Sequence, residues 1–90
     1  MTISKEMVFY CLEEMENHNK KGGIVSYHIS KESYNDLLIT ADKMELNGDP
    51  DHITIRTFCK LVKPSELMEP GIVFKMFHAA MEILMGLYLH

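Results

Sequence analysis

Residue types that mark several protein classes are scarce in this chain of 90 residues. It has two cysteines, Cys11 and Cys59, no tryptophan, three prolines and five glycines. A small secreted domain usually carries four or more cysteines, so we interpret both thiols as buried and reduced, with a disulfide or a reactive thiol as the alternative. The low proline and glycine content excludes collagen-like and linker-type chains.

The chain also has fewer basic than acidic residues. Nine Lys and Arg residues against 13 Asp and Glu residues give a net charge of −4, which argues against a general polyanion binder. With 47% hydrophobic and 24% charged residues, the composition is that of one globular domain over residues 1–90. The N-terminal residues lack the basic stretch and apolar run of a signal peptide, so we expect a cytoplasmic protein.

The longest apolar stretch, residues 71–89, is close to the roughly 20 residues that span a bilayer. Lys75, His78 and Glu82 interrupt this stretch, and a charged residue at the membrane centre costs about 2.5–3.5 kcal/mol. We therefore predict no membrane partner, with a tail anchor as the less favoured alternative.

Periodic apolar residues predict two amphipathic helices with an extended segment between them. The first helix covers residues 4–19, with Ser4 as its N-cap and a glycine pair after its end. Residues 24–29 are β-branched and aromatic, which predicts a short strand or an extended connector. Ser30 then caps a second helix over residues 31–46, which ends at the turn-forming run Asn47-Gly48-Asp49-Pro50-Asp51.

The hydrophobic period changes to two after this turn. Apolar and β-branched residues alternate from Ile53 to Leu61, which predicts one strand over residues 52–62, or two strands joined by a bend. Lys63-Pro64-Ser65 ends this segment.

A last helix is predicted over about residues 69–89, with Pro70 in its first turn. Its polar residues cluster on one narrow side and the remainder is apolar. One packing partner leaves part of such a surface uncovered, so we predict a homodimer interface; alternatively, the domain covers the helix alone. The predicted interface residues are Phe77, Met81, Leu84, Met85 and Tyr88.

Two runs of residues resemble parts of a known family. The run from Tyr34-Asn35-Asp36-Leu37-Leu38 to Leu46-Asn47-Gly48 resembles the third helix of winged-helix domains, which ends in a glycine turn before the wing. Leu67-Met68-Glu69-Pro70-Gly71-Ile72 resembles the Leu-Thr-Glu-x-Gly-Ile pattern that often opens the helix after the wing, with Met68 in place of threonine. Over residues 4–80 the chain is similar to small YjcQ-like winged-helix proteins of bacilli and their phages.

The resemblance implies a small α+β, winged-helix-like domain with a β-ribbon wing and an apolar C-terminal helix. It also implies DNA binding and a role in transcription regulation. Residues 20–30 form a short interval for the middle helix of such a domain, so an extended segment or a single turn is expected there. The predicted helix-turn-helix unit is therefore degenerate.

No residue pattern indicates catalysis or a cofactor. The five histidines and two cysteines lack ligand spacing such as C-x₂-C or H-x₃-H, which argues against a metal site. Phosphate-binding loops, nucleophile elbows and dinucleotide-binding turns are absent from the sequence. Glu13, Glu14 and Glu16 are typical of a solvated helix face. We therefore expect a protein that is not an enzyme and needs no metal or cofactor.

Two functions remain open. The first is a homodimer that binds double-stranded DNA, with phosphate contacts from the acid-free segment 52–63 and base contacts from residues 31–46. Its candidate nucleic-acid-binding residues are Lys31, Ser33, Asn35, Arg56, Lys60 and Lys63. The second is an acidic protein-interaction module, encoded by a phage or mobile element, that binds a host protein. The resemblance favours DNA binding, whereas two lysines against four acidic residues over 31–46, a net charge of −2, favour the protein partner.

Overall fold

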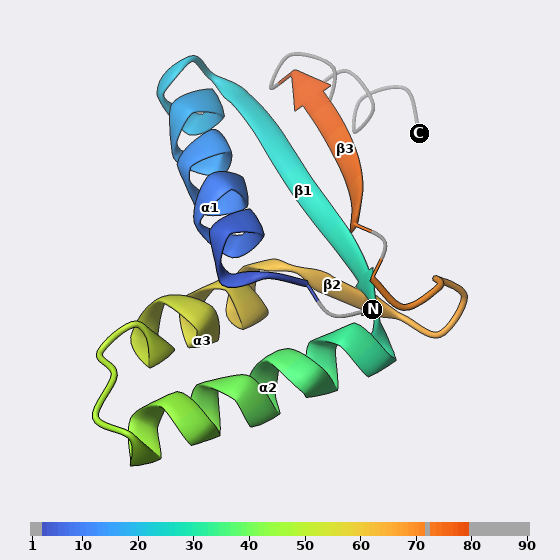
Figure 1. Ribbon diagram of the computed structural model, residues 1–90. Coiled ribbons are helices and arrows are strands. Elements are labelled where there is room, and N and C mark those ends of the chain that lie inside the picture. Colours follow the sequence, from blue (N-terminus) through green and yellow to red (C-terminus); the bar gives the residue numbers. More distant parts are fainter. Residues whose placement is uncertain (1–2, 72, 80–90) are drawn as a thin grey trace.

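The computed structural model describes residues 3–71 and 73–79. Over these residues the chain forms three helices and a three-stranded mixed sheet, which confirms the predicted α+β class. The arrangement is consistent with a winged-helix-like domain. In chain order the elements are α1 (Lys5–Lys20), β1 (Gly23–Ser30), α2 (Lys31–Leu46), α3 (His52–Leu61), β2 (Lys63–Ser65) and β3 (Val73–Ala79) (Figure 1).

The first half of the chain follows the predictions closely. Both helices begin at a serine whose hydroxyl oxygen accepts a backbone hydrogen bond in the first turn. Ser4 Oγ accepts from the Met7 N–H at 3.2 Å, and Ser30 Oγ accepts from the Ser33 N–H at 3.0 Å. The predicted strand between the helices is confirmed as β1, so the predictions for these three elements are correct to within about one residue.

The prediction for residues 52–62 is wrong, because this segment is the helix α3 and not a strand. Its β-branched residues fit a period of two, but its apolar residues also fit a helix. Ile55, Phe58, Cys59 and Val62 follow the i, i+3, i+4, i+7 spacing, and all four are buried. A strand would have placed Ile55 and Cys59 on one face and Phe58 and Val62 on the other, whereas the helix directs all four into one core.

The prediction of a helix over residues 69–89 is also wrong for its described part, because Val73–Ala79 form the strand β3. Residues 66–67 and 70–71 make turns, and Gly71 has a φ of 80° shortly before β3 begins at Val73. Residues 80–89 lie outside the described residues, and so do Met81, Leu84, Met85 and Tyr88 of the predicted dimer interface. Phe77 of that interface lies in β3, where its backbone is opposite Val25 of β1.

The sheet has the order β2-β1-β3, with β1 in the centre. β2 runs parallel to β1, with Lys63 opposite His28, and β3 runs antiparallel to it, from Val73 opposite Ile29 to Ala79 opposite Gly23. Because β1 separates β2 from β3, the two last strands do not form a hairpin. The predicted β-ribbon wing over 52–62 is therefore replaced by α3.

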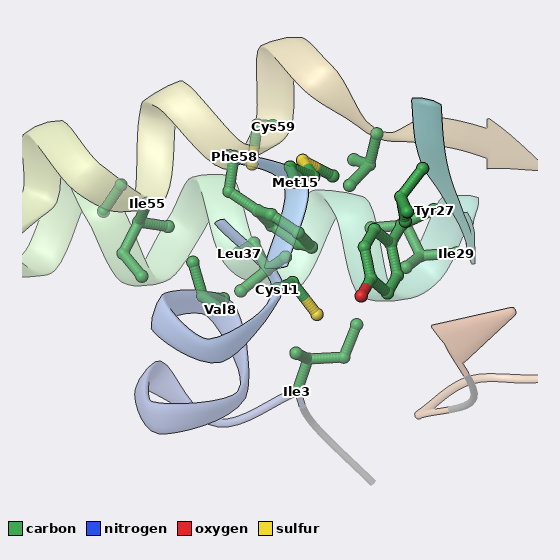
Figure 2. Packing of buried hydrophobic residues seen from close by; sticks show 13 residues of the cluster. Ile3, Val8, Cys11, Met15, Tyr27, Ile29, Leu37, Ile55, Phe58 and Cys59 are labelled. Atoms are coloured by element: carbon green, nitrogen blue, oxygen red, sulfur yellow. The ribbon is translucent and has the colours of Figure 1, made fainter. Parts of the chain in front are cut away.

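The core lies between α1, the α2–α3 pair and one face of the sheet. α1 packs against β1, whose inward residues Val25, Tyr27 and Ile29 alternate along the strand, and α2 packs against α3. Figure 2 shows Phe58 projecting from α3 towards Leu37 and Cys11. The buried hydrophobic residues are Ile3, Val8, Cys11, Met15, Val25, Tyr27, Ile29, Leu37, Ala41, Ile55, Phe58, Cys59 and Val62.

Candidate nucleic-acid interface

A short turn joins α2 to α3 and sets the angle between the two helices (Figure 1). α2 ends at Asn47, and Gly48 follows with a φ of 74°, a conformation that favours glycine. Asp49 Oδ1 then accepts a hydrogen bond from the Asp51 N–H at 2.9 Å. Asp51 is the N-cap of α3, which has no side-chain cap hydrogen bond, and the aspartates and Pro50 at residues 49–51 are residue types that are frequent at a helix start. The same residues predict a turn from the sequence, and the structure shows that α3 begins directly after it.

α3 has one buried and one exposed face. Ile55, Phe58 and Cys59 anchor it in the core. The exposed face carries two aliphatic and two polar residues, Ile53, Thr57, Lys60 and Leu61. Thr57 belongs to the candidate surface only because the segment is a helix, so the strand interpretation did not single it out.

Acidic residues are absent from α3 and from the short strand that follows it. Residues 52–65, which include all of α3 and β2, contain no Asp or Glu. Lys60 and Lys63 are exposed and make no ion pair with another described residue. Lys60 and Lys63 therefore give the end of α3 and the start of β2 a positive charge that suits an anionic partner.

Arg56 is engaged within the fold. Its guanidinium lies 2.7 Å from Asp42 Oδ1 and 2.9 Å from Glu45 Oε2, both in α2. These two carboxylates raise the pKa of Arg56 above its ordinary value. Because planar guanidinium groups suit such double contacts, Arg56 fastens α3 to α2.

The remaining predicted residues lie away from this surface or inside the fold. Lys31, at the start of α2, pairs with Glu66 at 2.8 Å, and Asn35 is exposed on α2. Ser33 is buried, and its hydroxyl oxygen accepts from the Ser30 hydroxyl and from the Gly71 N–H at 2.9 Å. It therefore has no access to a base. Of the six candidates, Lys60 at the end of α3 and Lys63 at the start of β2 are exposed, close in sequence and without an ion pair to any described residue.

A second polar cluster joins α1 to the sheet. Glu14 of α1 accepts a hydrogen bond from the Tyr27 hydroxyl, and Lys75 Nζ lies 3.2 Å from the same carboxylate oxygen. Hydrogen bonds from Tyr27 and Tyr10, together with Lys75, lower the pKa of Glu14 to about 2. Burial raises the pKa of the adjacent Cys11 thiol.

The chemistry of this cluster is that of a structural contact. A carboxylate with a pKa of about 2 stays ionised near neutral pH and is a poor general acid or base there. A thiol with a raised pKa is a poor nucleophile, because the thiolate is the reactive form. We therefore assign the cluster to holding α1 on the sheet.

In the part of the chain that the structure describes, no group of three or more His, Cys, Asp and Glu side chains could hold a metal ion. No helix in that part is long and apolar enough to cross a membrane. Comparisons with protein-family models, curated proteins and solved structures found no match to this chain.

Proposed function

We propose that this protein is a DNA-binding regulator that acts as a homodimer and contacts double-stranded DNA through α3. The observation that carries the proposal is the exposed pair Lys60, at the end of α3, and Lys63, at the start of β2, in a stretch without acidic residues. In a helix-turn-helix pair the second helix enters the major groove, and α2, the turn and α3 have this order.

The structure also changes the argument from charge. In this proposal the helix with a net charge of −2 is α2, the first helix of the pair, which crosses the DNA backbone and does not enter the groove. Two of its acidic residues, Asp42 and Glu45, are neutralised in part by Arg56. Because of this pairing, the acidic residues of α2 argue less strongly against DNA binding than they do from the sequence alone.

Residues of α3 and the adjoining Lys63 of β2 have different parts in the proposed contact. Lys60 and Lys63 are available for phosphate oxygens, and these contacts supply affinity without sequence preference. Thr57, on the same exposed face, is short enough to approach a base edge, although its hydroxyl also donates to the Ile53 carbonyl at 2.9 Å. Arg56 has a positioning role, because it keeps α3 on α2.

The test is the salt dependence of binding to mixed duplex DNA for a variant with both Lys60→Ala and Lys63→Ala. The logarithm of the binding constant falls linearly with the logarithm of the salt concentration, and each lost phosphate contact makes this fall less steep by about 0.9. We therefore expect the slope to become less steep by about 1.8 per subunit. A variant with Lys20→Ala and Lys21→Ala is the matched control, because it removes the same charge at the end of α1 remote from α3 (Figure 1). Equal effects of the two variants would refute contact through α3, and no binding by wild type at about 50 mM salt would refute DNA binding.

A protein partner is the second candidate, and the two aliphatic residues on α3 favour it. Ile53 is 61% exposed and Leu61 is 51% exposed, on the same helix face as Lys60. Exposed aliphatic side chains within a polar surround are a feature of protein interfaces. In this alternative the non-enzymatic, acidic protein binds a host protein through α3.

A variant with Ile53→Ser and Leu61→Ser distinguishes the two candidates. If α3 contacts DNA mainly through its lysines, this variant keeps the wild-type salt slope. If a protein partner binds there instead, the wild type has no affinity for DNA. A partner protein that binds the wild type then fails to bind the serine variant but still binds the control variant with Lys20→Ala and Lys21→Ala.

A further inference from the structure

The two edges of the sheet differ in how well they resist pairing with another strand. An edge strand presents unpaired backbone N–H and C=O groups, and proteins protect such edges with short strands, proline and lysine. The β2 edge has all three features, since it is three residues long and contains Lys63 and Pro64. β3 is seven residues long and contains no proline, and among the described residues it pairs with β1 alone.

Within residues 3–71 and 73–79 no strand pairs with the outer edge of β3, and the charged residue of β3 does not protect this edge. Lys75 lies on the sheet face that α1 covers, where its ammonium group contacts Glu14. Phe74 lies on the other face beside His28, with 6.2 Å between the ring centroids, and is half exposed. The edge of β3 is therefore long and weakly charged, and an exposed aromatic side chain adjoins it. Such an edge favours the addition of a strand.

We propose that β3 pairs with β3 of a second copy of this chain, antiparallel about a two-fold axis at Met76. The strand is self-complementary in this register. Lys75 is opposite Phe77 of the partner subunit, and Phe74 is opposite His78 of the partner subunit, so no two lysines face each other. All seven residues of β3 find a counterpart, and the two three-stranded sheets become one continuous sheet.

This inference gives a surface to the homodimer of the proposed function and does not depend on DNA binding. It also moves the interface from the predicted C-terminal helix to the strand β3, which shares only Phe77 with the predicted set. The dimer is closed, because a two-fold axis uses the open edge of each copy once and leaves the protected β2 edges outside.

Cysteine cross-linking tests the register. Residues directly opposite each other in an antiparallel pair have Cα atoms about 4.5–5.5 Å apart, within the range that a disulfide bridges. We expect Met76→Cys to give a disulfide-linked dimer under a mild oxidant. Thr40→Cys, on the exposed face of α2, and the wild type with its buried Cys11 and Cys59 are controls that stay unlinked.

The mass in solution tests the interface without a cross-link. We expect twice 10.4 kDa for the wild type and for Met76→Leu. We expect 10.4 kDa for Met76→Lys at the same concentration, because two ammonium groups then face each other at the axis. Circular dichroism shows whether the Met76→Lys variant is folded. If it is unfolded, cross-linking through Met76→Cys decides whether β3 forms the interface.

Three outcomes separate the possibilities. A wild type of 10.4 kDa overturns the dimer, even if DNA binding is found. A dimer that cross-links through Leu84→Cys but not through Met76→Cys overturns pairing through β3. A dimer that cross-links through Met76→Cys but has no affinity for DNA supports this inference and refutes DNA binding.

Discussion

Replacing Glu14 by Gln tests how strongly the polar cluster holds α1 on the sheet. The carboxylate of Glu14 accepts hydrogen bonds from Tyr27 and Tyr10 and pairs with Lys75, which is in β3. These contacts lower the pKa of Glu14 from 4.5 to about 2. Glutamine keeps the shape of the side chain and one acceptor oxygen but removes the charge. The variant therefore isolates the contribution of the ionised form.

The size of the effect follows from the lowered pKa. A decrease from 4.5 to about 2 corresponds to an upper limit of about 3–4 kcal/mol in the free energy of unfolding. Glu14 is 14% exposed and Lys75 is 51% exposed, so solvent weakens the pair, and we expect a loss of about 2 kcal/mol at neutral pH. Because the folded-state pKa is depressed, this stability is fully present above pH 4.5 and is lost as the pH falls to about 2.

Urea unfolding at several pH values measures this contribution. We expect the difference between wild type and Glu14→Gln to be constant from about pH 7 to pH 5 and to shrink steadily from about pH 4.5 to pH 3. Glu13→Gln is the matched control, because Glu13 is the exposed neighbour on the same helix and we expect a change within about 0.5 kcal/mol. A Glu14→Gln difference that stays constant down to about pH 3 would refute the electrostatic explanation.

Three other variants test the core and the turns by urea unfolding. Phe58→Ala is expected to lower the free energy of unfolding by about 3–5 kcal/mol, because Phe58 is fully buried. Its control is Leu67→Ala, at a site 97% exposed, which is expected to lower it by less than about 0.5 kcal/mol. Similar costs for the two variants would contradict the placement of α3. Gly48→Ala is expected to cost about 1 kcal/mol through its positive φ alone, since a Cβ there meets no atom within 4 Å. Ser33→Ala leaves the Gly71 N–H without its acceptor, with an expected cost of about 1–3 kcal/mol; an unchanged midpoint would show that this contact is not formed in solution.

Local signals in the sequence were sufficient for α1, β1 and α2. Serine caps, a glycine after α2 and a helical apolar period act within a few residues of each other, so no distant contact is needed to recognise them. Ser4 and Ser30 make the predicted cap hydrogen bonds, and Gly48 has the positive φ that a helix stop favours.

The candidate site could be predicted in part. The acid-free segment with Arg56, Lys60 and Lys63 was evident from the sequence, but its place in the fold was not. Pairing of Arg56 with two carboxylates of α2, and burial of Ser33 under the turn that contains Gly71, depend on how separate elements meet. Neither the ion pairs of Arg56 nor the burial of Ser33 can be predicted from neighbouring residues in the sequence.

The sequence by itself was sufficient to predict the α+β class, the helices α1 and α2 and the strand β1 between them. Only the tertiary structure decided between strand and helix in the second half of the chain. Residues 52–62 fit both periods, and the single core available to Ile55 and Phe58 selects the helix α3. Residues 73–79 are apolar enough for a buried helix, but β1 offers them an edge with unpaired backbone groups, and strand pairing satisfies those groups.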